Sequence, residues 1–571
     1  MSGHVIVCGM GDVGYRVVEL LHRLGESVQV VTAQARPERR LAAEAHGISV
    51  AIGDARAEEL LLEAGLLEAK ALLAATDNDL ANIEIALDAR RLRPDLPIVL
   101  RLFDQELARQ LEPVLEVRRA LNMAALAAPS FAASALGESI LVSFPIGEVP
   151  FVVGRQTLSD GGPLSGCQSL SRVAQLHRLQ ALLREHPEGL SALPPNDEPV
   201  GPADRLTLLG RKEDWDCLFG AAEATPRRGE NVPWRGRLRQ IAALAAASWR
   251  AEPILLRFVL VGLAVLIPAT ALFFHFQMGF APADAIYFTV TSLYGSIDPA
   301  HTSQAVKIYE VLLVILGSIS VATLSSLFTA HLVGSRLRRI LGGQPMPRGG
   351  HVIVVGMGRV GFRILHELLA VGVPVIAIDA DPSARLLPSA RTIAPVVTGD
   401  ARAGDILSHA RLSSARAVVA ATSDDAVNLS ISLVAKRFNP RVRTVSRLFD
   451  ADFARKVESA LGVDAALSAS LIAAPTFAAA ILAPHVAKAV IVRDRLLVLL
   501  ERKAGAEWEG LRPAELRFGK GIHLLMRGGK LVTETAAAVG EAPLQAEEEV
   551  LAVFCRTLAP TGWSARQAPA R

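Results

Sequence analysis

Two long apolar runs constrain this chain more than any other feature, because neither is suited to remain in water. The first, residues 254–276, carries a single charged side chain, Arg257, and the second covers about residues 311–333. A helix needs roughly 20 apolar residues to cross the hydrocarbon core of a bilayer, so each run is long enough to span one. The sequence therefore predicts a membrane unit over residues 253–341 with two transmembrane helices.

The segment between the two runs, residues 281–298, is too short and too polar for a third span. It is apolar at first and then rich in hydroxyl side chains and glycine. Irregular backbone is tolerated at membrane depth only where it is buried in protein or lines a wet cavity. The pattern predicts a re-entrant pore loop contributed by several subunits. A membrane hairpin without conduction is the alternative.

This arrangement resembles the potassium-channel family, whose pore unit is an outer helix, a pore helix, a filter loop and an inner helix. The family filter reads Thr-Val-Gly-Tyr-Gly, and its backbone carbonyls replace the water around the ion. The candidate filter residues here are Thr289, Thr291, Ser292, Leu293, Tyr294 and Gly295. This segment can be aligned with the family filter in two registers, one residue apart. In both registers a bulky residue, Leu293 or Tyr294, replaces the first glycine of the filter, although glycine is the residue that reaches positive φ without strain. The resemblance implies a homo-tetramer conducting a monovalent cation, expected to be K⁺, with its selectivity left open.

Arginines cluster before the first run, between residues 235 and 250, and after the second, between residues 336 and 348. The loop between the runs contains one lysine, Lys307, and no arginine. Because basic residues near the spans stay on the cytoplasmic side, we expect a multi-pass protein of the plasma (inner) membrane, in contact with lipid, with both termini in the cytoplasm. Gly317, midway along the second run, is a candidate gating hinge or a site of close helix packing.

An internal repeat is the second strong feature of the chain. Residues 4–16 recur as residues 351–363, and each copy has an apolar strand, then Gly-x-Gly-x-x-Gly, then a helical pattern. Gly-Asp-Ala-Arg at residues 53–56 recurs at residues 399–402, and further matches, including Asn82 with Asn428, follow in the same order. One domain has therefore been used twice.

The glycine pattern, placed between a strand and a helix, is typical of dinucleotide binding. The first glycine makes the turn, the second lets a pyrophosphate approach the backbone, and the third lets the helix pack on the strand. The candidate glycines are Gly9, Gly11, Gly14, Gly356, Gly358 and Gly361. Later apolar strands predict a parallel, doubly wound α/β sheet in each copy. A Rossmann-like fold that holds no nucleotide is the alternative.

The repeats resemble the regulator-of-potassium-conductance family (Trk-type, amino-terminal domain) over about residues 1–140 and 348–485. The resemblance implies a nucleotide at the carboxyl ends of the strands. The further residues that it places around the nucleotide are Asp54, Thr76, Arg101, Asp400, Thr422 and Arg447. Each of these could instead be a helix cap or a buried polar group.

The two copies differ at the end of the second strand. The second copy has Asp379, whose carboxylate suits the ribose hydroxyls of NAD, whereas the first has Thr32, followed by Arg36, Arg39 and Arg40. A site that lacks this carboxylate and has arginines nearby could accept the 2′-phosphate of NADP. We therefore expect NAD(H) or an adenine nucleotide in the second copy, and NADP(H), another anionic nucleotide or none in the first. Solvated arginines on a helix are the alternative.

Composition excludes several classes of function. A net charge of +3 over 571 residues gives no nucleic-acid footprint. Four widely spaced cysteines without a histidine cluster predict no metal site. No acid/base pair with a substrate cavity is evident, so we expect no enzymatic activity, although the dinucleotide motif leaves a membrane-bound dehydrogenase as a rival.

These observations divide the chain into α/β regulatory domains around an all-α pore unit. The predicted domains are a Rossmann-like regulatory domain (1–139) with its carboxyl-terminal subdomain (140–225), a juxtamembrane helix (226–252), the pore domain (253–341), a second Rossmann-like domain (348–485) with its subdomain (486–558), and a tail (559–571). The sequence predicts a nucleotide-regulated cation channel. The alternative is a non-conducting, membrane-anchored nucleotide sensor or regulatory subunit of a potassium transport system.

Overall fold

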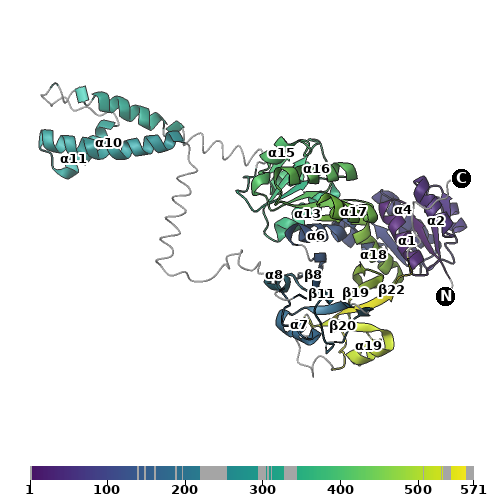
Figure 1. Ribbon diagram of the computed structural model, residues 1–571. Coiled ribbons are helices and arrows are strands. Elements are labelled where there is room, and N and C mark those ends of the chain that lie inside the picture. The colour runs from purple at the N-terminus through teal and green to yellow at the C-terminus, as the bar shows by residue number, and fades with distance from the viewer. Residues whose placement is uncertain are drawn as a thin grey trace. The chain divides into compact units, whose positions relative to one another are not determined.

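The protein forms two compact units, residues 1–224 together with 344–571, and residues 225–343 (Figure 1). The computed structural model describes residues 3–137, 140–146, 149–159, 162–186, 189–195, 197–218, 254–293, 304, 308–309, 311–323, 325–326, 344–505, 507–528, 530–531 and 542–560. The predicted juxtamembrane helix (226–252) and most of the predicted tail (559–571) lie outside these residues. The two units are described separately below.

The first copy of the repeat is a six-stranded parallel sheet in the order β3-β2-β1-β4-β5-β6, with helices on its faces. Its strands are β1 (Val5–Cys8), β2 (Val28–Thr32), β3 (Ser49–Ile52), β4 (Ala71–Ala74), β5 (Ile98–Arg101) and β6 (Arg119–Leu121). Its helices are α1 (Asp12–Arg23), α2 (Pro37–Ala45), α3 (Glu58–Glu63), α4 (Asp79–Leu92), α5 (Gln105–Val114) and α6 (Met123–Leu136). The central strands β1, β4 and β5 are buried along their whole length, as expected when helices cover both faces.

The second copy has the same topology, in the order β14-β13-β12-β15-β16-β17. Its strands are β12 (Val352–Val355), β13 (Val375–Asp379), β14 (Val396–Thr398), β15 (Ala417–Ala420), β16 (Arg443–Arg447) and β17 (Ala465–Leu467). Its helices are α13 (Arg359–Ala370), α14 (Leu387–Ile393), α15 (Gly404–His409), η2 (Leu412–Ser414), α16 (Asp425–Phe438), α17 (Ala451–Leu461) and α18 (Ala469–Leu482). The predicted doubly wound α/β fold is confirmed for both copies.

Each copy gives its last helix to the other. Helix α6 packs against α13 of the second copy, α18 packs against α1 of the first, and the two exchanged helices also touch each other (Figure 1). Arginines cap these helices across the interface, because Arg443 Nε donates to Ser134 O at 2.5 Å and Arg118 Nη1 donates to Ile481 O at 2.5 Å. The two copies therefore share one hydrophobic core.

The chain after each Rossmann unit forms a five-stranded antiparallel sheet. The first contains β7 (Ile140–Ile146), β8 (Val149–Thr157), β9 (Gln180–His186), β10 (Gly189–Ala192) and β11 (Arg205–Arg211), with α7 (Leu170–His177) and α8 (Lys212–Leu218). The second contains β18 (Val486–Val492), β19 (Arg495–Lys503), β20 (Ile522–Arg527), β21 (Lys530–Leu531) and β22 (Glu549–Thr557), with α19 (Pro513–Lys520). The two sheets bury a joint core that includes Phe151, Leu183, Leu497 and Val553.

The second compact unit, which includes the predicted membrane unit, contains α10 (Ile254–Met278), α11 (Pro282–Leu293) and a further apolar helix, Val311–Thr323. Within the described residues, α10 alone is long and apolar enough to cross a bilayer. The second predicted span continues to residue 333, beyond the part that the structure describes. Inside the unit, Phe274 is fully buried, and the hydroxyls of Thr270 and Tyr309 lie 2.9 Å apart.

The predicted pore loop needs a correction. Thr289, Thr291, Ser292 and Leu293 lie in helix α11 and not in a filter loop. The Thr289 hydroxyl donates to Ala285 O at 2.7 Å and that of Thr291 to Tyr287 O at 3.0 Å, so both hydroxyls are satisfied four residues back along the helix. A filter backbone could begin only after Leu293, and Tyr294 and Gly295 lie outside the described residues.

Gly317 lies directly against the end of α11. A Cβ atom at this position would come within 2.8 Å of Leu293 Cα, and it would overlap the Leu293 carbonyl oxygen. The close approach of two helix backbones accounts for this glycine, as the packing alternative predicted. A role as a gating hinge stays a prediction.

Candidate functional site

A cleft of about 1740 Å³ lies at the carboxyl ends of both parallel sheets, and residues of both copies line it. Both glycine-rich loops face this cleft, as do Arg101 and Arg447 from the ends of β5 and β16. Ligands of open α/β sheets bind at this edge, outside the carboxyl ends of the strands. The two predicted sites therefore open into one shared space.

The first glycine of each motif is required by the turn. Gly9 and Gly356 have φ values of +103° and +91°, and a Cβ at either would come within 2.9 Å of a backbone nitrogen, that of Thr76 or Thr422. Any other residue would be strained there.

The second and third glycines have different neighbours. A Cβ on Gly14 or Gly361 would overlap the carbonyl oxygen of the first glycine of the same motif, so these positions serve the packing of helix on strand. A Cβ on Gly11 or Gly358 would meet no protein atom within 4 Å, and both residues line the cleft. Nothing in the described protein requires glycine at these two positions. The close approach of a pyrophosphate would require it, so the loops fit the predicted ligand.

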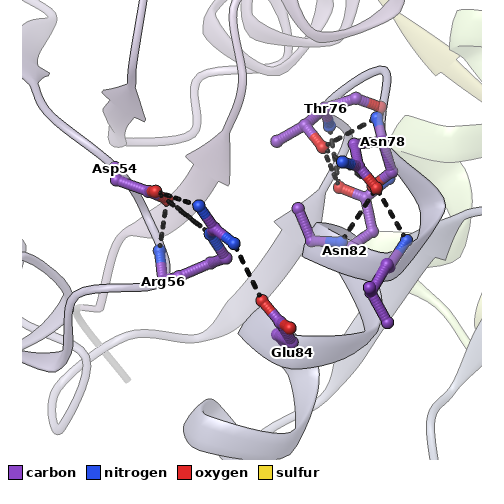
Figure 2. Close-up of polar contacts among 8 residues, drawn as sticks. Asp54, Arg56, Thr76, Asn78, Asn82 and Glu84 are labelled. Carbon is purple, nitrogen blue, oxygen red and sulfur yellow. Dashed lines mark hydrogen bonds and ion pairs between the residues drawn. The ribbon is translucent and has the colours of Figure 1, made fainter.

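Two buried asparagines, Asn82 and Asn428, hold the edge of the cleft together, and Figure 2 shows the contacts of Asn82. Asn82 Oδ1 accepts hydrogen bonds from Thr76 N at 2.9 Å and Thr76 Oγ1 at 2.7 Å, and its Nδ2 donates to Arg101 O at 2.9 Å. Asn428 makes the same three bonds at the same distances to Thr422 and Arg447. The hydroxyls of both threonines are thus engaged within the protein. The repeat contained both asparagines, but sequence reasoning gave them no role.

The aspartates of the Gly-Asp-Ala-Arg motifs form ion pairs with the arginines two residues later. Asp54 binds Arg56 at 2.6 Å, and Arg56 also contacts Glu84 at 3.3 Å. Figure 2 shows this chain of contacts. Asp400 and Arg402 repeat the pair at 2.6 Å. Hydrogen bonds from the arginine lower the pKa of each carboxyl. Asp400 lines the cleft, whereas Asp54 is not among its lining residues.

Arg101 is a deeply buried cation of the cleft. Only 7% of its surface is exposed, its Nη1 donates to Thr76 O at 3.2 Å, and its Nε has no hydrogen-bond partner among the described residues. Burial lowers its pKa, although the carboxylates of Asp77 and Asp12 act in the opposite direction. Arg447 donates in the same way to Thr422 O at 3.2 Å, and burial lowers its pKa as well. Each arginine places a buried positive charge at the cleft.

The residues at the ends of the second strands both fix the glycine-rich loop. Asp379 accepts from Met357 N at 2.5 Å and from Asp381 N at 2.9 Å. Thr32 Oγ1 accepts from Met10 N at 3.2 Å and donates to Gln34 O at 2.7 Å. The carboxylate oxygens of Asp379 keep free lone pairs for ribose hydroxyls, because each oxygen can accept more than one bond. The Thr32 hydroxyl has one proton, and it already donates that proton to Gln34 O.

The three arginines after Thr32 differ in their exposure and in their partners. Arg36 is exposed and lines the cleft, while Arg40 forms an ion pair with Glu44 at 2.7 Å on the surface of α2, as the solvated alternative predicted. Arg39 is buried and donates to Asp12 Oδ1 at 2.8 Å and to Met10 O at 3.3 Å. Only Arg36 remains available to a 2′-phosphate.

The charge at the start of the motif helix is inverted between the copies. Asp12 begins α1 and is paired with Arg39, whereas Arg359 begins α13 and places its guanidinium carbon 3.3 Å from the ring centre of Phe103 in the first copy. The equivalent ring, Phe449, is covered at 4.5 Å by Arg39. Each copy therefore places an arginine over an aromatic ring of the other copy.

A sequence profile of the TrkA-N domain matches residues 5–122 and again residues 352–469. The chain contains two TrkA-N domains. The matched segments contain both glycine-rich motifs and end close to the exchanged helices α6 and α18.

Curated relatives resemble parts of the chain. Potassium channel protein 1 of Methanocaldococcus jannaschii is 35% identical over 100 residues, 17% of this chain and 29% of that protein. The Trk system potassium uptake protein TrkA of Mycobacterium tuberculosis is 29% identical over 219 residues, 35% of this chain and 91% of that protein. An uncharacterised protein of Methanothermus fervidus is matched over 27% of its length. The chain thus spans less than a third of two of these relatives, and its TrkA-N domains are homologous to potassium channel and Trk uptake proteins.

Solved structures share the fold. The GsuK channel is similar over 97% of this chain and 77% of its own, with a TM-score of 0.52 and 15% identity. The GsuK channel bound to NAD gives a TM-score of 0.50 with 14% identity over the same shares. At these identities the likeness shows the fold alone.

Proposed function

We propose that the protein is a nucleotide-regulated cation channel of the plasma membrane, conducting K⁺ as a homo-tetramer with both termini in the cytoplasm. The observation that carries the proposal is the presence, in one chain, of an apolar membrane unit and two TrkA-N domains whose glycine-rich loops face one cleft. The names of the relatives support it, because they are a potassium channel protein and a potassium uptake protein.

The second TrkA-N domain is proposed to bind NAD(H) or another adenine nucleotide. Asp379 offers its carboxylate to the ribose, Gly358 leaves room for the pyrophosphate, and the free N–H groups of α13 face the phosphates. The structure of the GsuK channel bound to NAD supports a dinucleotide ligand in this fold. No acid/base pair is required for binding, and we expect no turnover of the nucleotide.

The first TrkA-N domain is proposed to bind NADP(H), another anionic nucleotide or none. Asp12 places a carboxylate at the start of α1, where a helix otherwise attracts anions, and it also engages Arg39. Arg36 and the Arg359 guanidinium from the second domain add positive charge to the same half of the cleft. The balance of these charges decides whether an anionic ligand binds there.

Gating follows if a nucleotide has a higher affinity for one arrangement of the two domains than for another. A ligand shifts such an equilibrium only through its differential affinity, and a ligand in the shared cleft contacts both domains. Only residues 342–351 separate the predicted membrane unit from β12. A connection this short can transmit movement of the second domain to the second apolar helix.

Ion flux through the reconstituted full-length protein tests the proposal. Purified protein in liposomes is expected to pass K⁺, with a flux that changes when NAD is added. Gly358→Val is expected to abolish the response to NAD while the basal flux remains. Absence of flux from well-oriented, NAD-binding protein would contradict the channel assignment.

The rival function is a non-conducting nucleotide sensor or a regulatory subunit of a potassium transport system. The observation that favours it is the continuation of α11 through Leu293, together with a bulky residue where the filter pattern has its first glycine. A reversal potential measured in mixed K⁺ and Na⁺ separates the two functions. A channel gives a defined value that moves with the ion gradients, and a sensor gives no current.

A further inference from the structure

Three arginines converge on one buried glutamate where the two antiparallel sheets meet. Arg493 in the turn between β18 and β19 lies 2.6 Å from Glu185 of β9, while Arg155 of β8 lies 3.6 Å and Arg205 of β11 lies 3.9 Å from the same carboxylate. Glu185 is 6% exposed, whereas the side chains of Arg205 and Arg493 are 47% and 57% exposed. The cluster carries three positive charges against one negative charge.

The strand register places a second polar group in this cluster. Arg205 pairs with Glu185 across β9, and Thr207, two residues further along β11, pairs with Arg155 across β8. Residues two apart on a strand, and their direct partners, share one face of a sheet. That face also supplies Val153, Leu183 and Leu209 to the core joining the two subdomains. The polar cluster therefore adjoins the contact between the subdomains.

The buried polar atoms of the cluster lack hydrogen bonds. Thr207 is fully buried and its Oγ1 has no hydrogen-bond partner in the described part of the chain. The same holds for Arg155 Nε and for both carboxylate oxygens of Glu185, whose contacts with the arginines are ion pairs without hydrogen-bond geometry. Nearly all buried polar groups in proteins are hydrogen-bonded, and an anion could pair with two of these atoms, the donors Thr207 Oγ1 and Arg155 Nε.

Neighbouring acids do not neutralise the excess charge. Asp204 and Glu198 are bound by Arg184 at 2.8 and 2.6 Å, and Asp494 lies beside Arg495. In the described residues, the ion pairs of Arg155, Arg205 and Arg493 all lead to Glu185. Burial lowers the pKa of Arg155, and the positive charges of Arg205 and Arg493 lower it further, against the effect of Glu185.

We propose that this cluster binds a doubly charged oxyanion of the phosphate class, either free phosphate or a phosphate monoester. The net charge of the cluster matches a dianion, and planar guanidinium groups bind phosphate oxygens through paired hydrogen bonds. The Thr207 hydroxyl can donate a further bond. Because Arg493 belongs to the second subdomain and the other groups to the first, the bound anion joins the two subdomains. The site is independent of the nucleotide cleft.

Thermal unfolding of the full-length protein in detergent tests the site. The buried tryptophans Trp215 and Trp508 belong to the two subdomains and report their unfolding by fluorescence. Sodium phosphate and glycerol 3-phosphate are titrated separately, with NaCl adjusted to hold the ionic strength constant. The concentration that gives half of the maximal stabilisation is expected to rise roughly tenfold in the double variant Arg205→Gln/Arg493→Gln, since charged hydrogen bonds are lost. The probe with the lower half-saturating concentration identifies the source of the phosphate group.

Two further variants separate a binding site from a set of structural ion pairs. Arg495→Gln removes a positive charge from the same hairpin without touching Glu185, and the response to phosphate should not change. Glu185→Gln removes the competing carboxylate, and it should tighten phosphate binding severalfold. The proposal would be overturned if each probe stabilised the wild type and the double variant equally, or if Glu185→Gln did not bind phosphate more tightly than the wild type. The cluster would then be only a set of ion pairs that holds the two subdomains together.

Discussion

The two TrkA-N domains of this chain share their framework and differ in the groups that face the cleft. The asparagine bridge, the first and third glycines and the Asp-Arg pairs recur with nearly the same distances. Two differences lie at the cleft. The first domain has Thr32 where the second has Asp379, and it has Asp12 where the second has Arg359. The comparison indicates that the repeat has kept its framework and both cleft arginines, and that it has changed the groups at the end of the second strand and at the start of the motif helix.

The sharpest test of the comparison blocks one glycine-rich loop at a time. Gly358→Val should weaken NAD binding by at least about a hundredfold, because the new side chain occupies the space that a pyrophosphate needs. The fold should persist, since a Cβ there meets no protein atom. Calorimetric titration of the full-length protein measures the affinity and the number of sites.

Gly11→Val is the matched variant in the first domain. It should leave the NAD affinity of the second domain unchanged and affect only a ligand of the first. Equal loss of NAD binding from both variants would show that the two halves of the cleft bind one ligand together, and the distinction between the domains would be wrong.

The second test uses a buried lysine that only one copy contains. Lys488 of β18 is 1% exposed and donates to Leu126 O of α6 at 2.6 Å, whereas the equivalent residue of β7 is Val142. Burial lowers the pKa of Lys488 to about 7. Between pH 7 and the ordinary lysine pKa, the unfolded chain binds more protons than the folded chain, so stability should rise with pH in this range.

Lys488→Met should remove this dependence. We expect the wild type to gain about 2 kcal/mol in the free energy of unfolding between pH 7 and 9 from this group, and the variant to gain none of it. Urea denaturation at several pH values measures the difference, with Val142→Met as the control. A parallel pH profile in the wild type and Lys488→Met would contradict the buried, neutral lysine.

The third test exchanges the residues at the ends of the second strands. Asp379→Thr should reduce NAD affinity about tenfold, because the ribose loses a charged acceptor. The glycine-rich loop should stay in place, since the Thr32 hydroxyl already accepts the equivalent backbone bond in the first domain. Titrations with NAD and NADP measure the change. An unaltered preference between the two nucleotides would remove Asp379 from the proposed site.

The smallest expected effect concerns the inverted charge. In a Gly358→Val background, Asp12→Asn should raise the affinity of the first domain for NADP or ATP about fivefold at low salt, because it removes a repelling charge and releases Arg39. Glu44→Gln, which releases Arg40 on the surface of α2, serves as the control. If both substitutions had the same effect, general charge and not the position of Asp12 would be responsible.

Much of the framework could be predicted from local patterns. The glycine motifs, the β-strands and the repeat predicted two parallel α/β sheets, because strand period and turn chemistry depend on neighbouring residues. The roles of Asn82, Asn428 and Lys488 could not be predicted, since their partners are supplied by distant strands and helices. The point where α11 ends could not be predicted, because serine and threonine hydroxyls that bond back along a helix give the same composition as a loop.

The sequence by itself determined that this chain contains two long apolar runs and one Rossmann-like α/β fold used twice. Only the tertiary structure decided that α6 and α18 are exchanged, that the two sites open into one cleft, and that Asp400 faces it while Asp54 does not. The physical reason is that periodicity is written in neighbouring residues, whereas a cleft depends on how two hydrophobic surfaces hundreds of residues apart bury each other.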